Sequence, residues 1–520
     1  MQLAGEAGGQ LAMKYYSWIM VLLLIMTSES IAHEADATAE TVVDEPQAES
    51  VTTQHSVNIN GKTIRYSATA GLALIRNDDD KLIGQYGYTA YIRDGVDDAS
   101  KRPIMFAYNG GPGSASIWLH MGVLGPRRIP VVDTEVTGPA PFGVVNNEFS
   151  ILDVADLVMM DPVGTGYAIP VGEGSGEDFW GVDADIDVAT QFIARFITDN
   201  NRWNSPKFVL GESYGGIRTG GVAYKLLTEY SIGLNGAILV SPFMDAAAAR
   251  DRFAIDLPHA LYLPTLAATA WYHDALEERP ENLVAFLAEV KEFALNEYSP
   301  ALLKGTSLPI AERSQLIRNL SRYTGLTEKY WDHSNLRVSH TNFVQELLRD
   351  QDVTVGRVDS RFKGRSINRI GASMEYDPFN AGVGPAFNAG FMHYYTNDLD
   401  FRQDRKYSVS GGVGEDWNWL HTLPNGQKTL ITNTAIDLAT TMTIYPHMKV
   451  LIQQGYYDLA TPFFVLEYVL SHMDLDVAQR ERITVEMYEA GHMMYVRAEE
   501  LAKFRQDYLD FVRGALSVSD

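Results

Sequence analysis

The chain contains no cysteine among its 520 residues. Disulfide bonds, cysteine nucleophiles and thiolate metal sites are therefore excluded. Positive charge is also scarce, because 42 lysines and arginines stand against 66 aspartates and glutamates, which gives a net charge of −24. Such a chain repels nucleic-acid phosphates and anionic membrane surfaces, so we expect neither as a partner. The acidity alone identifies no substrate.

Long hydrophobic runs are missing as well. A membrane-spanning helix takes about 20 apolar residues, and no run in this sequence reaches that length. The apolar run at residues 18–26 follows Lys14 and precedes small residues suited to cleavage. This arrangement predicts a secretory signal peptide over residues 1–32, starting at Met13, with no membrane insertion after its removal; an N-terminal membrane anchor is the alternative. Export without cysteine predicts a secreted or bacterial periplasmic protein. Residues 33–55 have the composition of a disordered acidic linker.

The most informative segment that is present is residues 211–215, with the sequence GESYG. This G-x-S-x-G pattern follows the apolar run 208–210 and opens a helical pattern over residues 214–230. A strand, a tight turn and a helix in this order are typical of a nucleophile elbow, which exposes a serine hydroxyl above a sheet. Ser213 is therefore the candidate nucleophile.

A serine nucleophile needs a base and a carboxylate that orients this base. In α/β-hydrolases the two follow the serine in the order acid, then histidine. An apolar strand at residues 450–452 leads to Asp458, and a second strand at 483–487 leads to His492. Open α/β sheets place their active groups in such loops at the carboxyl ends of strands. We expect Asp458 and His492 to complete a triad with Ser213.

Alternating strand and helix patterns predict an α/β fold. Residues 56–93 alternate apolar and polar side chains, as in an antiparallel meander. Short apolar runs at 104–108 and 157–160 predict buried central strands, and helical spacing over residues 182–196 predicts a crossover helix. We predict a mostly parallel central sheet that is flanked by helices.

The strand–helix rhythm is interrupted in the second half of the chain. Several helical patterns and a stretch rich in glycine, asparagine and aromatic residues occupy residues 245–430. We predict that this segment is a large inserted cap and that residues 56–244 and 431–520 form the core.

Residues 109–114, with the sequence NGGPGS, point to a family. Together with residues 161–167 (DPVGTGY), the GESYG segment and the candidate triad, they resemble the serine carboxypeptidases. The resemblance covers about residues 85–245 and 445–500. It implies the α/β-hydrolase fold and a reaction that uses no metal or cofactor.

The resemblance also implies roles for backbone and side-chain groups near the serine. The N–H groups of Gly111 and Tyr214 would form an oxyanion hole, which agrees with the general rule that one donor follows the nucleophile. Asn109, Glu212 and the N–H of Gly110 would bind the terminal carboxylate of a peptide. Glu212 can donate a hydrogen bond only when it is protonated, which implies activity at acidic pH.

Two positions depart from the family's pattern. Val123 stands where members often have a second glutamate that faces the first, and Ala107 stands where they often have tryptophan. Both changes affect the strength and the pH dependence of carboxylate recognition.

We predict a serine-type carboxypeptidase that removes C-terminal residues from peptides with a free C-terminus, through an acyl-enzyme on Ser213. One alternative is an esterase or acyltransferase that uses the same triad. Another is a catalytically silent peptide-binding protein. The sequence determines neither the preferred residues nor the oligomeric state.

Overall fold

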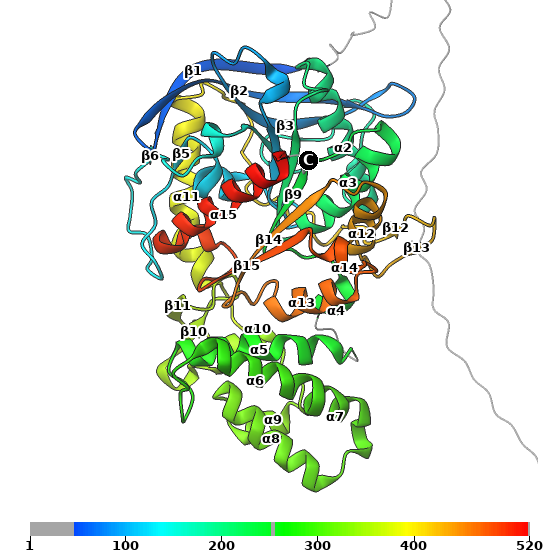
Figure 1. Cartoon of the computed structure of the whole chain (residues 1–520). Helices are drawn as coiled ribbons and strands as arrows, with labels where there is room; N and C mark the ends of the chain where they lie inside the picture. Colours follow the sequence, from blue (N-terminus) through cyan, green and yellow to red (C-terminus); the bar gives the residue numbers. More distant parts are fainter. Residues whose placement is uncertain (1–45, 251–254, 518–520) are drawn as a thin grey trace, which may run out of the picture. The chain divides into compact units, whose positions relative to one another are not determined.

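A nine-stranded sheet runs through the computed structural model, which describes residues 46–250 and 255–517 (Figure 1). Its strand order is β1-β2-β3-β7-β4-β8-β9-β14-β15. The strands are β1 (Glu49–Ile59), β2 (Lys62–Arg76), β3 (Leu82–Arg93), β7 (Asp156–Asp161), β4 (Ile104–Tyr108), β8 (Lys207–Glu212), β9 (Gly236–Val240), β14 (Lys449–Gly455) and β15 (Ile483–Tyr488). Three two-stranded pairs lie outside it: β5 (Arg127–Arg128) with β6 (Val145–Asn146), β10 (Val353–Val355) with β11 (Lys363–Arg365), and β12 (His421–Thr422) with β13 (Lys428–Thr429).

The sheet is mostly parallel, as predicted. β1, β2 and β3 form an antiparallel meander, and β3 pairs antiparallel with β7. From β7 to β15 all neighbouring strands are parallel. The central strands β4 and β9 are buried at every position, because helices cover both faces of a parallel sheet.

The prediction of a disordered linker over residues 33–55 is wrong for its last residues. Its last part lies in β1, which begins at Glu49 and pairs with β2 from Glu49 opposite Leu72 onward. The polar composition is that of a sheet edge, where alternate side chains face solvent. The predicted signal peptide and the linker's first part lie outside the described residues.

Helices cover both faces of the sheet (Figure 1). The longer helices are α2 (Val182–Asp199), α3 (Gly215–Tyr230), α5 (Leu257–Tyr272), α6 (Leu283–Phe293), α8 (Ile310–Thr324), α11 (Pro378–Asn397), α12 (Ala435–Ile444), α13 (Phe463–His472) and α15 (Ala498–Leu516). The shorter ones are α1 (Ile117–Leu119), α4 (Ala246–Ala249), α7 (Ser299–Lys304), α9 (Glu328–His333), α10 (His340–Glu346) and α14 (Val477–Arg480).

The pleat of the sheet divides the hydrophobic core in two. In β4, Phe106 belongs to one hydrophobic cluster with side chains of α2, α3 and α12, whereas its neighbours Met105 and Ala107 belong to another with side chains of α11 and α15. Alternation of side chains across a strand produces this division. Ala107 thus lies in the core.

The inserted residues contribute to both halves of this core. Leu263 of α5 and Leu320 of α8 belong to the same cluster as α2 and α3, and Phe387 of α11 belongs to the opposite one. The described residues from Pro46 onward form one compact unit, so their contacts do not separate the predicted cap from the predicted core. Within the described residues, no helix combines the length and apolar character needed to cross a bilayer.

Candidate active site

The turn between β8 and α3 holds Ser213 in an uncommon backbone conformation, with φ of +61°. Its N–H donates to the carbonyl of Val240 at 3.0 Å, and its carbonyl accepts from the N–H of Phe243 at 2.9 Å. Gly211 allows the turn, because a Cβ there would lie 2.3 Å from the carbonyl oxygen of Gly215. Such strained positions persist only where neighbouring structure fixes them, and they occur often at active sites.

Asp458 and His492 lie in the loops after β14 and β15, as predicted. These strands are parallel neighbours, so their carboxyl ends meet at one edge of the sheet. The Oδ2 atom of Asp458 lies 2.8 Å from Nδ1 of His492. Oδ1 of Asp458 accepts from the N–H groups of Ala460 and Thr461 at 2.8 and 2.9 Å, which fixes the carboxylate.

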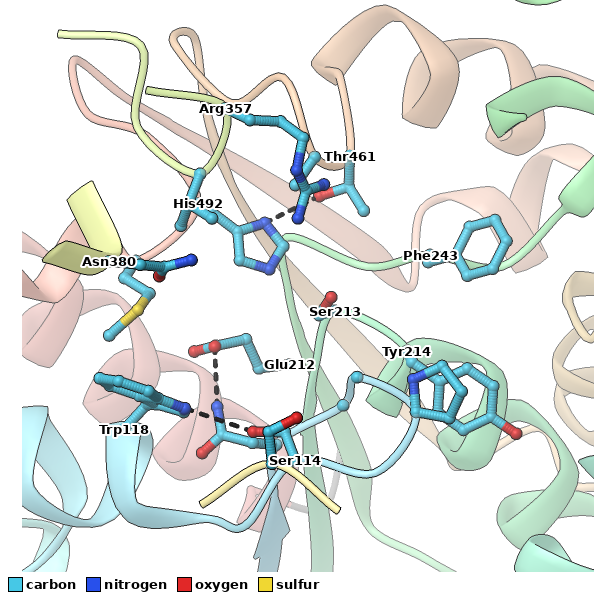
Figure 2. A pocket seen from close by; sticks show the side chains of 18 of the residues that line it. Ser114, Trp118, Glu212, Ser213, Tyr214, Phe243, Arg357, Asn380, Thr461 and His492 are labelled. Atoms are coloured by element: carbon cyan, nitrogen blue, oxygen red, sulfur yellow. Dashed lines mark hydrogen bonds between the residues drawn. The ribbon is translucent and has the colours of Figure 1, made fainter. Parts of the chain in front are cut away.

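The contact with Asp458 orients the imidazole toward the candidate nucleophile. A proton on Nδ1 that is donated to Asp458 leaves Nε2 as the acceptor. Figure 2 shows Ser213 on the side of the ring away from Thr461, which lies 3.1 Å from Nδ1. No hydrogen bond joins Oγ of Ser213 to His492 within the described residues. Such bonds are often long in a free enzyme and tighten when substrate binds.

Opposing effects act on the pKa of His492. Burial lowers this pKa, but the charge of Asp458 and its hydrogen bond outweigh burial, so the pKa stands above 6.5. Glu212 raises it further, and Arg357 lowers it. An imidazole with such a pKa is a stronger base, but it is neutral only at higher pH.

The loop after β4 packs directly on the elbow. A Cβ at Gly110 would lie 2.4 Å from the backbone nitrogen of Tyr214, so the backbones of the two segments are in contact. Among the described residues, neither Gly111 nor Tyr214 donates a backbone hydrogen bond. Both residues line the cavity, and their N–H groups are left for a ligand there.

Glu212 is buried next to the nucleophile and is 3% exposed. Nδ2 of Asn109 donates to its Oε1 at 2.7 Å, and the hydroxyl of Tyr495 donates to its Oε2 at 2.6 Å. Burial raises the pKa of the Glu212 carboxyl to about 7, although both donors and the charge of His492 lower it. A neutral carboxyl group is therefore accessible in weakly acidic solution.

Tyr495 was not predicted as a site residue. Val123, at the position of the family's second glutamate, is fully buried among apolar side chains and leaves Glu212 without a carboxyl partner there. The ring of Tyr495 covers Gly122, where a Cβ would lie 2.4 Å from the ring. The only signal in the sequence is that Tyr495 follows His492 by three residues.

The predicted site residues line one cavity of about 650 Å³. Figure 2 shows Ser213, His492 and Glu212 around it. Asn109, Gly110 and Gly111, from the loop after β4, also line it. Asp458 lies behind His492 and is not exposed. Aromatic side chains and arginines from the inserted segment complete the wall.

Within residues 46–250 and 255–517, no group of three or more histidine, aspartate or glutamate side chains is arranged to hold a metal ion.

Comparisons with known proteins bear on the fold and the family of the chain. A model of the family described as serine carboxypeptidase matches residues 91–513. Among solved structures, the chain is similar to Kex1Δp, a prohormone-processing carboxypeptidase from Saccharomyces cerevisiae, with 14% identity and a TM-score of 0.55 over 88% of this chain and 92% of that chain. A proline iminopeptidase from Mycobacterium smegmatis has 13% identity and a TM-score of 0.35, over 89% and 98% of the two chains. No sequence of a curated protein matches.

The family match spans well over half of the chain, and the similarity to Kex1Δp extends over nearly all of the fold. The predicted α/β-hydrolase fold is confirmed by the mostly parallel sheet with helices on both faces. The chain belongs to the serine carboxypeptidase family.

Proposed function

We propose that the protein is a serine-type carboxypeptidase, which hydrolyses the last peptide bond of substrates with a free C-terminus. The observation that carries the proposal is the pair Asn109 and Glu212 beside the candidate nucleophile. Buried next to Ser213, Glu212 has a carboxyl pKa of about 7 and can bind an anionic carboxylate once it is protonated. An esterase has no need for such a group.

In the proposed reaction, Nε2 of His492 takes the proton of the Ser213 hydroxyl as Oγ attacks the scissile carbonyl. The oxyanion accepts hydrogen bonds from the N–H groups of Gly111 and Tyr214. His492 then gives its proton to the nitrogen of the leaving residue, and the C–N bond breaks. Water, activated by the same imidazole, hydrolyses the acyl ester and restores the serine. Asp458 orients the imidazole and stabilises its charged form.

The leaving residue is positioned by its carboxylate. The second amide hydrogen of Asn109, the N–H of Gly110 and the protonated carboxyl of Glu212 supply three donors to it. This group recognises what only a C-terminal residue carries, so internal peptide bonds are poor substrates. A missing contact leaves buried donors unpaired, which costs about 1–3 kcal/mol.

Matched peptides that end in a free acid or an amide test the proposal. We expect the free acid to be hydrolysed about ten to a hundred times faster, as kcat/KM. Ser213→Ala should lower kcat by roughly 10⁴- to 10⁶-fold and should keep the unfolding temperature of the wild type. Equal rates for the acid and the amide, with simple esters cleaved faster than both, would leave the esterase alternative. Peptide binding without any turnover in the wild type would leave the silent binding protein.

We also propose that the protein acts outside the cytoplasm, on peptides, after removal of a signal peptide. The apolar run at residues 18–26 and the absence of cysteine support this location. Mass spectrometry of the mature protein after expression in a bacterial host measures whether the N-terminus has been cleaved near residue 32.

A further inference from the structure

The cavity beside Ser213 carries positive charge in a protein that is otherwise strongly acidic. Arg250 and Arg357 lie in its wall, and among the described residues Glu212 is the only acidic side chain that lines it. Burial raises the pKa of the Glu212 carboxyl to about 7, so this group is partly neutral near neutral pH. The net charge of the whole chain is −24. The positive charge is thus local to the cavity.

Arg357 has a fixed backbone. It follows β10, and its N–H donates to Oδ2 of Asp377 at 3.1 Å. Its carbonyl accepts from the N–H of Leu459, the residue after Asp458, at 3.1 Å. These two backbone hydrogen bonds, to separate segments, therefore fix the position from which the Arg357 side chain extends.

The guanidinium group of Arg357 has no such anchor. Within the described residues it donates no hydrogen bond and no carboxylate lies within ion-pair distance of it, although the side chain is half-buried. Other buried arginines are paired: Arg218 lies 2.8 Å from Asp185, and Arg361 lies 2.6 Å from Asp359. A half-buried cation that lacks a partner in the free protein has donors left for a ligand.

This guanidinium lies close to the reacting groups. Figure 2 shows Arg357 and Glu212 on opposite sides of the His492 ring. The charge of Arg357 lowers the pKa of His492, as expected of a neighbouring cation. The side chain therefore lines the cavity close to His492, on the other side of this imidazole from Glu212.

Arg250, at the end of α4, adds a second cation to the same wall. Its guanidinium lies 3.5 Å from the ring centroid of Trp419 and 5.5 Å from that of Phe243. Stacking on these aromatic rings holds the positive charge of Arg250 in the wall of the cavity.

We propose that this cavity selects peptides with an aspartate or glutamate side chain on one of the two residues that flank the scissile bond, and that Arg357 binds this side chain. The proposal rests on the carboxypeptidase function proposed above and names its substrate class. A guanidinium and a carboxylate form short, charge-assisted hydrogen bonds in a matching planar geometry. The terminal carboxylate has its own donors at Asn109 and Gly110, so the acidic side chain is a second anion in the same cavity.

A set of free-acid peptides tests the proposal, with glutamate, glutamine or lysine at the last or at the penultimate position. For the wild type we expect kcat/KM to be roughly ten to a hundred times higher for glutamate than for glutamine at one of these positions, and lowest for lysine. The position at which the ratio appears tells which of the two residues Arg357 contacts. Higher ionic strength should reduce the ratio, because a partly exposed charge pair is screened.

Variants of Arg357 show whether this residue is the cause. Arg357→Gln should remove most of the glutamate-to-glutamine ratio, and Arg357→Glu should favour the lysine peptide. Each ratio compares two peptides on the same enzyme, so a change in the pKa of His492 cancels. Arg318→Gln, an exposed arginine on α8 in the same inserted segment, is the matched control and should keep the wild-type ratio.

The outcomes separate this inference from the proposed function. Wild-type enzyme that cleaves neutral free-acid peptides but shows no preference for glutamate at either position overturns the inference and leaves the carboxypeptidase function intact. A wild-type enzyme that cleaves none of the peptides contradicts both. If Arg357→Gln instead removes the preference for free acids over amides and leaves the side-chain ratio unchanged, Arg357 binds the terminal carboxylate and the inference is wrong.

Discussion

The carboxyl group of Glu212 and the imidazole of His492 impose opposite demands on pH. In the proposed reaction Glu212 must be protonated, below its pKa of about 7, to bind a carboxylate, whereas His492 must be neutral, above its own raised pKa, to accept a proton. Each group shifts the pKa of the other, so the pair titrates in two coupled steps. We therefore expect a narrow bell-shaped profile of kcat/KM for free-acid peptides.

Replacing Glu212 by glutamine should widen this profile in both directions. An amide donates at every pH, so the fall in kcat/KM above about pH 7 should flatten. The acidic limb should move to lower pH, since the negative charge of Glu212 no longer raises the pKa of His492. The pH dependence of kcat/KM for one free-acid peptide measures both effects. A variant with the wild-type profile would show that Glu212 does not govern recognition.

The hydroxyl of Tyr495 tunes the same carboxyl group from the other side. Its hydrogen bond to Oε2 favours the ionised form of Glu212 and lowers its pKa. Tyr495→Phe should therefore raise that pKa and extend the preference for free acids over amides to higher pH. The measurement is the ratio of the two rates between pH 6 and 9. A uniform loss of rate with no change in this pH dependence would mean that the hydroxyl only supports the packing.

At the scale of elements, His421 connects the inserted segment to the core. It lies on β12, where Nδ1 is 2.7 Å from Asp183 of α2 and Nε2 is 3.0 Å from Asp437 of α12. Burial lowers the pKa of His421, but the two carboxylates outweigh burial and raise it to about 9. A charged imidazole between two carboxylates therefore holds three segments together near neutral pH.

This contact should make stability depend on pH in the alkaline range. A folded-state pKa above the unfolded value of about 6.5 stabilises the protein fully below pH 6.5, and this contribution is lost as the pH rises through 9. We expect the wild type to lose at most about 3 kcal/mol of unfolding free energy over this window, and His421→Gln to lose much less. Unfolding midpoints at several pH values measure the difference. Parallel curves for the two proteins would contradict the assigned charge.

Over the whole molecule, one hydrophobic cluster continues from the sheet into the inserted helices. A segment that shares its core with the rest should not unfold on its own. We expect α8, in the insertion, and β8, which carries the elbow, to lose protection at the same denaturant concentration. Hydrogen exchange at increasing urea measures both in one experiment. Exchange of α8 at clearly lower urea would instead identify the insertion as a separate folding unit.

The sequence determined the parts of this protein that contiguous residues encode. Short apolar runs predicted the central strands, because a strand buried on both faces needs apolar side chains at successive positions. The GESYG segment predicted the turn that holds Ser213, since only glycine fits where the elbow's backbone approaches itself. The order of Ser213, Asp458 and His492 sufficed to predict that the last two lie on neighbouring loops, because parallel strands bring their carboxyl ends together.

Contacts between distant segments were decided only by the tertiary structure. Tyr495 lies 283 residues from Glu212 in the chain, and no local pattern predicts that its hydroxyl donates a hydrogen bond to that carboxyl group. The position of Arg357 beside His492 likewise depends on how an irregular loop of the insertion packs against the strand ends. The helix α11 and its packing were also missed, because the sequence showed there only a stretch rich in glycine, asparagine and aromatic residues, and composition does not tell what such side chains pack against. The spacing of residues along the chain was enough to predict the candidate triad. The surroundings of Glu212 and the wall of the cavity depend on contacts between segments that are far apart in the sequence, which no local pattern encodes.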